Sequence, residues 1–355
     1  MTGPDAEWVA AAGDHLIRYR WQCWWYGDSV GFQGLLAATD LTGDARFQDF
    51  AYGMAKFWLG RRQPRRAEPG QAFHWSDHTA PGAAMVELAC RYQDDELMAG
   101  LTALADWLLT RPQAGGVPLL DPGQALYAWV DCMQFHGPFL ARLAQATGEP
   151  RYREAAIWFL LGHDRVLRDD SGLYCHVYDM TTHRTNGVHW GRGQGWAMLG
   201  LWQTLALLPD GRPEAGHIRD LLTAHLAAMT RCQTPDGSWR TVVDDPSSYP
   251  ESSVAAFYLA TVLPAIAAGA LDGSAHEKAT ERAAAAFVAE LGPGGYYRGV
   301  SANTHAGEAC SYLPIPRGVT VPWGQGPALM AAAALHAKAL QAKETTSDNR
   351  WGDQE

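Results

Sequence analysis

The sequence has no apolar segment long enough to cross a membrane and little that suits nucleic-acid binding. None of its stretches approaches the roughly 18 uncharged apolar residues of a membrane helix. Its 28 Lys and Arg stand against 38 Asp and Glu, a formal net charge of −10, and its densest basic run, Arg61 to Arg66, is interrupted by Gln63 and Pro64. Because phosphate neutralisation supplies most of the affinity for nucleic acid, we expect neither a membrane protein nor a nucleic-acid-binding one.

Closely spaced cysteine pairs are also missing. The six cysteines lie far apart, without a C-x-x-C pair, and disulfide frameworks belong to short secreted chains. The first twelve residues contain Asp5 and Glu7 and no apolar run, so we expect no signal peptide. Together these features predict reduced thiols in the core of a cytoplasmic protein.

Strand patterns are scarce, and most apolar residues recur with a helical period. Leu97, Leu101, Leu104, Ala105 and Leu108, for example, line one face of a helix. Two segments, 42–47 and 147–152, both contain Thr-Gly, an acidic residue, a variable residue, Arg and an aromatic residue. Glycine favours the left-handed end of one helix and the acidic residue favours the start of the next, so each segment predicts the turn of a helical hairpin.

A polar and aromatic cluster precedes or begins one helix of each expected hairpin. The clusters are residues 24–28, 75–78, 129–131, 190–194, 249–253 and 323–326, and successive clusters are 49 to 74 residues apart. This spacing accommodates two helices with their loops, and repeats of this length indicate stacked units. We therefore predict an all-α protein, an (α/α)6 barrel of six hairpins closed by pairing the first helix with the last. Residues 1–343 are expected to form one domain and residues 344–355 a disordered tail.

Two carboxylates at the start of inner helices are the candidates for catalysis. Asp131 precedes an apolar helix, where a buried charge must be paired or must shift its pKa. Asp77 lies in the cluster His74-Trp75-Ser76-Asp77-His78. If the two carboxyls face each other, one is kept protonated near neutral pH, which suits general acid and base catalysis. The alternative is that both residues only cap helices.

The segment from Gly172 to Trp196 carries the most specific pattern. Glycines alternate with large side chains around Trp190, Arg192, Gln194 and Trp196, which brings those side chains together. Arg192 could hold a carboxylate and the tryptophans could stack on a sugar ring. The alternatives are core packing for Trp190 and Trp196, a structural ion pair for Arg192, and a core role for His176. The histidine pairs 74/78 and 183/189 lack a third ligand at a recognisable spacing, so we predict no metal and no other cofactor.

These motifs resemble glycoside hydrolase family 105, the unsaturated rhamnogalacturonyl hydrolases, and the related unsaturated glucuronyl hydrolases of family 88. The resemblance rests on Trp129-x-Asp131, Gly172-Leu-Tyr-x-His176-x-x-Asp179 and Trp190-Gly-Arg192-Gly-x-Gly-Trp196, and extends to Asp77-His78, Glu251-Ser-Ser and Trp323-Gly-Gln325-Gly. It implies an (α/α)6 barrel with Asp131 as general acid and base and Asp77 as its partner. The residues expected to bind the substrate are His176, Arg192, Trp190, Trp196, Gln194, Trp129, His78 and Trp25.

The resemblance also implies the reaction. The substrate would be an oligosaccharide made by a polysaccharide lyase, ending in a 4-deoxy-4,5-unsaturated uronic acid, which is released after hydration of its vinyl ether. Two alternatives stay open: hydrolysis of saturated uronides on the same barrel, and a carbohydrate-binding protein that has lost catalysis. We expect a monomer or a homodimer.

Overall fold

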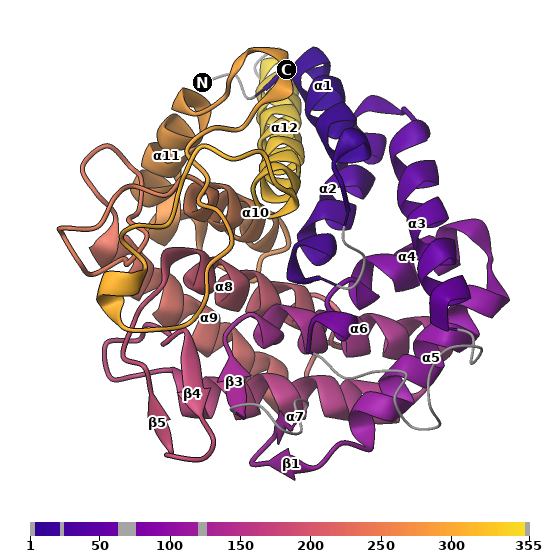
Figure 1. The fold of residues 1–355 in the computed structure, drawn as a ribbon. Coiled ribbons are helices and arrows are strands. Elements are labelled where there is room, and N and C mark those ends of the chain that lie inside the picture. The colour runs from indigo at the N-terminus through magenta and orange to yellow at the C-terminus, as the bar shows by residue number, and fades with distance from the viewer. Residues whose placement is uncertain (1–3, 22–24, 63–75, 120–125, 352–355) are drawn as a thin grey trace.

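The computed structural model describes residues 4–21, 25–62, 76–119 and 126–351, which form twelve α-helices arranged in two concentric rings (Figure 1). The inner helices are α2 (Tyr26–Thr42), α4 (Gly82–Tyr92), α6 (Cys132–Thr147), α8 (Gly191–Leu205), α10 (Ser253–Ala267) and α12 (Pro322–Trp351). The outer helices are α1 (Ala6–Arg18), α3 (Arg46–Arg62), α5 (Asp95–Leu109), α7 (Pro150–Leu167), α9 (Pro213–Cys232) and α11 (Gly273–Ala289). Each inner helix packs against the next, and α12 packs against both α2 and α1, so the ring is closed. The (α/α)6 barrel predicted from the sequence is confirmed.

Burial separates the two rings. Every residue of α8 except Gln203 is buried, as expected for a helix surrounded by others. The outer helix α5 instead buries one stripe, which consists of the predicted residues Leu97, Leu101, Leu104, Ala105 and Leu108. The hairpin turns also follow the prediction, because Gly43 and Gly148 end α2 and α6 with φ of 73° and 74°, the left-handed region that glycine adopts freely.

The ring closes where two glycines let helices touch. A Cβ atom on Gly34 of α2 would lie 2.5 Å from the Cα atom of Gly326 in α12, and one on Gly326 would lie 2.2 Å from the carbonyl oxygen of Val30. Larger residues at these positions would push α2 and α12 apart. The contact that completes the barrel therefore depends on the absence of two side chains.

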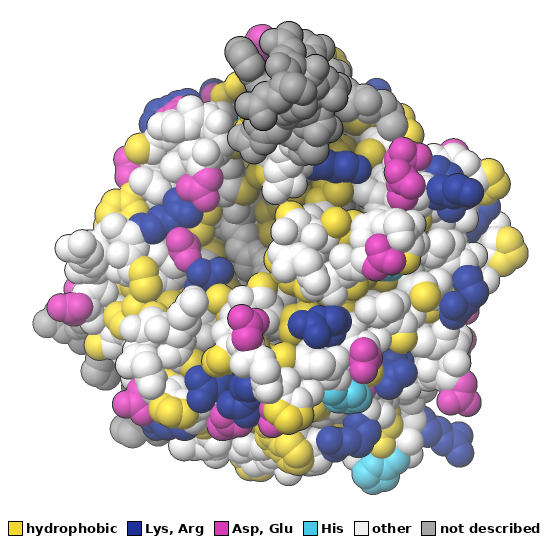
Figure 2. Space-filling model, turned by 180° about the vertical axis from the view of Figure 1, so that it is seen from behind, with side chains coloured by type: hydrophobic (Ala, Val, Ile, Leu, Met, Phe, Trp, Pro, Cys, Tyr) yellow, Lys and Arg dark blue, Asp and Glu magenta, His cyan; other side chains and the backbone are white. Residues whose placement is uncertain are grey.

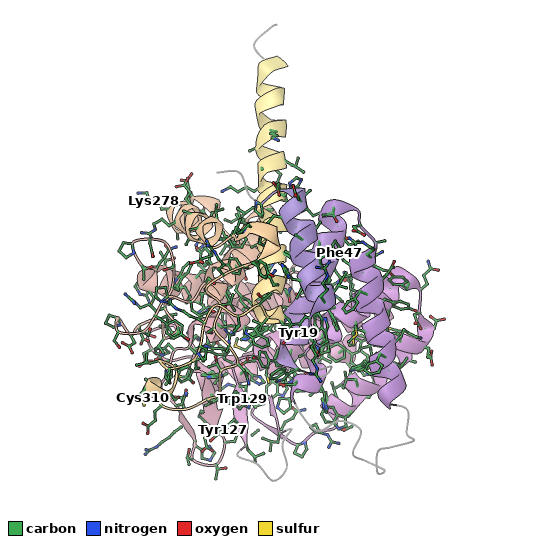
Figure 3. The ribbon with its side chains drawn as sticks, turned by 45° about the horizontal axis from the view of Figure 1, so that its top comes forward. Tyr19, Phe47, Tyr127, Trp129, Lys278 and Cys310 are labelled. Carbon is green, nitrogen blue, oxygen red and sulfur yellow. The ribbon has the colours of Figure 1, made fainter. Side chains whose placement is uncertain are left out.

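Short strands and 3-10 helices lie in the connections at the end of the barrel where the inner helices begin. They are the strands β1 (Gln113–Ala114), β2 (Val117–Pro118), β3 (Tyr127–Trp129), β4 (Val177–Asp179) and β5 (Arg184–Thr185), with the 3-10 helices η1 (Ser76–Thr79), η2 (Pro293–Gly295) and η3 (Ala309–Ser311). Strands β3, β4 and β5 form an antiparallel sheet in which Trp129 pairs with Val177. Figure 3 shows Trp129 and Cys310 at the end of the molecule away from the projecting C-terminal part of α12.

The cysteines differ in part from the prediction. Among the described residues none forms a disulfide, and Cys132 and Cys175 are buried as expected, but Cys90 and Cys310 are exposed. Those two are not core thiols, because each lies on a surface turn or helix face. Cys23 lies outside the described residues.

Helix α12 is assigned as far as Trp351, and residues 352–355 lie outside the described residues. The disordered tail expected for 344–355 stays a prediction. No helix in the described part of the chain combines the length and the apolarity needed to span a membrane. Figure 2 shows acidic and basic side chains interspersed over one face of the molecule.

Candidate active site

The described residues of the six clusters singled out in the sequence lie at the N-terminal ends of inner helices. They immediately precede or begin α2, α4, α6, α8, α10 and α12, which places them around one end of the barrel. Free N–H groups and the helix dipoles make this end favourable for anionic ligands. The sequence predicted that each cluster precedes or begins one helix of a hairpin, as the structure shows.

Asp131 occupies the N-cap position of α6 without acting as a cap. Its backbone is already helical, with φ of −55° and ψ of −36°, and its side chain accepts no capping hydrogen bond. The residue is 8% exposed, and its Oδ2 atom is buried with no hydrogen-bond partner among the described residues. The capping alternative therefore does not account for this aspartate.

Burial changes the protonation of Asp131. Removing the carboxylate from water raises its pKa to about 7, although the nearby Arg192 guanidinium favours the charged form. Near neutral pH the carboxyl is then partly protonated and partly ionised. A group in this state can both give and take a proton, as general acid and base catalysis requires.

Asp77 lies in η1, which packs against α6. Asp77 and Asp131 both influence the same neighbour, Tyr26, which is the first residue of α2. Burial raises the pKa of the Tyr26 hydroxyl, the Arg192 guanidinium lowers it, and the Asp131 and Asp77 carboxylates raise it further. Tyr26 is therefore within electrostatic reach of both acids, so the structure brings the two predicted carboxylates to the same end of the barrel.

His176 faces Asp131 from the segment just before β4. Its Nε2 atom lies 3.8 Å from Oδ2 of Asp131, and its Nδ1 atom is 2.6 Å from the hydroxyl of Tyr312. The Trp190 ring lies 4.3 Å from the imidazole and the Trp129 ring meets it edge-on at 5.3 Å. Burial and the positive charge of Arg192 lower the pKa of His176 to about 3, so the ring is neutral.

Arg192 takes the structural role that the sequence left open. Its side chain is fully buried and forms an ion pair with the equally buried Glu251, with 3.5 Å between Nη1 and Oε1. It also donates to the hydroxyls of Ser301 and Thr304 and to the carbonyl of Ala302. These partners use both terminal nitrogens and tie the loop 301–304 to α8, while Nε is buried with no hydrogen-bond partner among the described residues. The contacts favour the ion-pair alternative, and binding of a substrate carboxylate by the guanidinium stays a prediction.

Gln194 and Trp196 are likewise structural. The Gln194 amide accepts a hydrogen bond from the Tyr174 backbone N–H at 2.9 Å and donates to its carbonyl at 2.6 Å, which fixes the chain two residues before His176. Trp196 is fully buried and packs edge-on against Phe135 and Phe257. Both were predicted to bind substrate, which stays a prediction. Their observed contacts are a backbone hydrogen-bond pair for Gln194 and core packing for Trp196.

The remaining residues predicted to bind substrate differ in their exposure to solvent. Trp190 is 2% exposed and lies between the imidazole of His176 and the guanidinium of Arg192, which fits its core-packing alternative. Trp129, Trp25 and His78 are half-buried, so part of each side chain faces solvent at this end of the barrel. Trp25 packs edge-on against Trp323 at 5.8 Å. These three keep surface with which to contact a sugar.

Tyr312 and Asn186 also lie at this site, although neither was predicted from the sequence. Tyr312 is fully buried beside His176, and Asn186 donates a hydrogen bond to its hydroxyl at 3.2 Å. Tyr312 lies in the segment between α11 and α12, which is mostly irregular, so no helical or strand period marks it. The dipeptide Asn186-Gly187 signals a turn, and only the fold reveals the contact with Tyr312.

Two clusters of metal-ligating side chain types lie near this region. The first is Cys132, His136 and His163, all buried, and the second is Asp169, Cys175 and His189. In the second, His189 contacts carboxylates of both Asp169 and Asp244, at 2.8 and 2.7 Å. Neither of these sets, found among the described residues, includes the carboxyl of Asp131 or Asp77.

The closed (α/α)6 barrel carries, at the rim of its inner helices, a buried carboxyl that is partly protonated near neutral pH, as acid and base catalysis on a glycoside requires. The chain belongs to Glycosyl Hydrolase Family 88, whose sequence profile matches residues 8–338. It is 26% identical to the unsaturated rhamnogalacturonyl hydrolase YesR of Bacillus subtilis, over 92% of this chain and 94% of that protein. It is 22% identical to an unsaturated 3S-rhamnoglycuronyl hydrolase of Alteromonas sp., over 85% of this chain and 75% of that protein.

Solved structures agree in fold. A possible member of family GH105 from Salmonella enterica superposes with a TM-score of 0.80 at 22% identity, covering 93% of both chains. The unsaturated glucuronyl hydrolase of Bacillus sp. GL1 superposes with a TM-score of 0.69 at 19% identity, covering 93% of this chain and 95% of that one. The resemblance inferred from the sequence motifs is thus confirmed.

Proposed function

We propose that this glycoside hydrolase removes a terminal 4-deoxy-4,5-unsaturated uronic acid from oligosaccharides produced by polysaccharide lyases. The observation that carries the proposal is Asp131, a buried carboxyl that caps no helix and whose pKa is raised to about 7. The names of the relatives in Bacillus subtilis and Alteromonas sp., both unsaturated-uronide hydrolases, support this substrate class.

The reaction adds water across the C4=C5 double bond of the substrate. Protonated Asp131 gives its proton to C4, which leaves an oxocarbenium-like cation shared by C5 and the ring oxygen. The Asp131 carboxylate then takes a proton from a water molecule as the water oxygen bonds to C5. The acid is thereby regenerated, and the C5 hemiketal opens and releases the remaining sugar.

Asp77 acts as the second carboxylate in this scheme. Its negative charge lies at the same end of the barrel and favours the cation that forms at C5. The N-terminal ends of the inner helices favour the carboxylate of the substrate. With Arg192 engaged by Glu251, the helix N-termini replace it as the source of positive potential for this anion.

The experiment that tests the function is a panel of unsaturated disaccharides from pectin, glycosaminoglycan, gellan and ulvan. Hydration destroys the ultraviolet absorbance of the ene-carboxylate, so we expect a decrease with at least one of the four. Asp131→Asn should abolish the decrease, whereas Asp106→Asn, on the surface of α5, should leave it unchanged. Cleavage of saturated uronides alone, or binding without turnover, would instead support one of the two alternatives.

A further inference from the structure

The hydrogen bonds around Asn186 have a fixed direction. Its Oδ1 atom faces the backbone N–H groups of Val177 and Val188, each at 3.4 Å, while its Nδ2 atom donates to the carbonyl of Gly307 at 2.9 Å. An amide rotated by 180° would place oxygen against the Gly307 carbonyl. The Nδ2 atom must therefore be the one that contacts Tyr312, and it donates to the tyrosine hydroxyl at 3.2 Å.

This direction determines which nitrogen of His176 carries its proton. The Tyr312 hydroxyl has one hydrogen to donate. Asn186 is itself a donor to this hydroxyl, so among the described residues Nδ1 of His176, 2.6 Å away, is the acceptor in contact with that hydrogen. Nδ1 must then be the acceptor, and a neutral imidazole that accepts at Nδ1 carries its single proton on Nε2. The Nε2 atom is the one that faces Oδ2 of Asp131 at 3.8 Å.

We propose that Tyr312, oriented by Asn186, is a positioning residue that sets the tautomer of His176 so that its Nε2–H faces Asp131. This inference rests on the proposed function, in which Asp131 alternates between acid and carboxylate. Oδ2 is buried and has no other partner among the described residues, so Nε2–H is the donor available when the carboxylate forms. If the two atoms approach more closely than the present 3.8 Å, a hydrogen bond from Nε2–H to Oδ2 leaves Oδ1 to carry the proton that is transferred.

The tautomer can be measured without any substrate. In the full-length protein labelled with 15N-histidine, long-range 1H–15N correlations distinguish a protonated ring nitrogen from an unprotonated one, and His176→Gln assigns the signal. We expect the proton on Nε2 in the native protein. A native protein with the proton on Nδ1 would overturn the proposal.

Two variants test the direction of the hydrogen bonds from Asn186 to Tyr312 and from Tyr312 to His176. Tyr312→Phe removes the donor to Nδ1, and Asn186→Asp replaces the donor to Tyr312 with a group that only accepts. Either change should move the His176 proton to Nδ1, and Asn186→Asp keeps the size of the side chain in case Tyr312→Phe folds poorly. Retention of the Nε2 proton in both variants would contradict the assigned direction.

Kinetics separate positioning from general stability. For Tyr312→Phe we expect kcat to fall about 10- to 100-fold, with KM changed by no more than about threefold. Tyr297→Phe is the matched control, because Tyr297 is equally buried and donates its hydroxyl to the Ser252 carbonyl at 2.6 Å. If Tyr312→Phe lost no more kcat than the control, the positioning role would be wrong. A native protein with the Nε2 proton that cleaved none of the disaccharides would refute the proposed function and leave the tautomer confirmed.

Discussion

Nε2 of His176 and Oδ2 of Asp131 lie 3.8 Å apart, and both residues are almost fully buried. One ring nitrogen thus faces one oxygen of the acid. That oxygen accepts no hydrogen bond from the backbone N–H groups at the start of α6. The pair joins two segments that the chain brings together through β3 and β4. In the proposed function this contact lies beside the acid that protonates the substrate.

The pH dependence of activity should report Asp131. Because burial raises its pKa to about 7 and the first step needs the protonated form, kcat/KM should fall as the pH rises through about 7. The measurement is kcat/KM from pH 5 to pH 9 on a cleaved disaccharide. An activity that stays constant up to pH 9 would mean that Asp131 is not the acid.

The same shift should make Asp131 destabilising at alkaline pH. Its folded-state pKa lies above the unfolded value of 3.8, so the folded protein holds the proton more tightly and loses stability as the pH rises from about 4 to 7. The loss is at most about 4 kcal/mol, at about 1.4 kcal/mol per pKa unit. Asp131→Asn should therefore raise the melting temperature more at pH 8 than at pH 4. An equal effect at both pH values would argue against a raised pKa.

Arg192→Ala should act on stability. Removing it leaves the buried Glu251 carboxylate without its partner, a change worth about 3–5 kcal/mol of unfolding free energy. Denaturation by urea measures the loss, and Glu251→Gln should weaken the effect of the arginine substitution because the uncompensated charge is then gone. A stable Arg192→Ala protein whose only defect is a higher KM would restore Arg192 as a substrate ligand.

Replacing Gly326, where α12 contacts α2, should lower the free energy of unfolding. In Gly326→Ala the new methyl group would lie 2.2 Å from the Val30 carbonyl oxygen, so we expect a loss of at least about 2 kcal/mol as α2 and α12 move apart. The control is Gly53→Ala in the outer helix α3, where no atom lies within 4 Å of the new Cβ. That variant should gain about 0.4–1 kcal/mol. Similar unfolding free energies for the two variants would contradict the closure account.

His189 should stabilise the fold up to high pH. Burial lowers its pKa, but the hydrogen bond to the Asp244 carboxylate outweighs burial, and with the contact to Cys175 raises the pKa to about 10. A raised histidine pKa gives stability that is complete below the unfolded value of 6.5 and is lost as the pH rises through about 10. His189→Gln should thus lower the melting temperature at pH 6 more than at pH 10.5. A difference that is the same at both values would show that the imidazolium does not bridge the two carboxylates.

The fold followed from the sequence because its signals repeat. Two turns of one composition and six clusters at similar spacing indicate hairpins and a common rim, and periodic leucines such as Leu101 mark the buried face of an outer helix. Asp131 could be singled out because an acid before an apolar helix is unusual. These features depend on local sequence and on spacing, which a single chain displays.

The sequence could not predict in the same way which polar side chains at the rim form internal hydrogen bonds. Arg192 and Gln194 are residue types that suit both sugar binding and internal hydrogen bonding, and the choice depends on Glu251 and Tyr174, which lie 59 and 20 residues away. Tyr312 lies 136 residues from His176 in a mostly irregular segment. Contacts of this kind arise from the closed ring and leave no period in the sequence.

The most direct test of the central claim is cleavage of an unsaturated disaccharide in D2O, followed by NMR of the released sugar. If Asp131 protonates C4, the native enzyme should place one solvent deuteron on C4 of the product, and Asp131→Asn should form no product. Release of the uronic acid with its double bond intact and no deuterium at C4 would contradict hydration and assign the enzyme to ordinary glycoside hydrolysis.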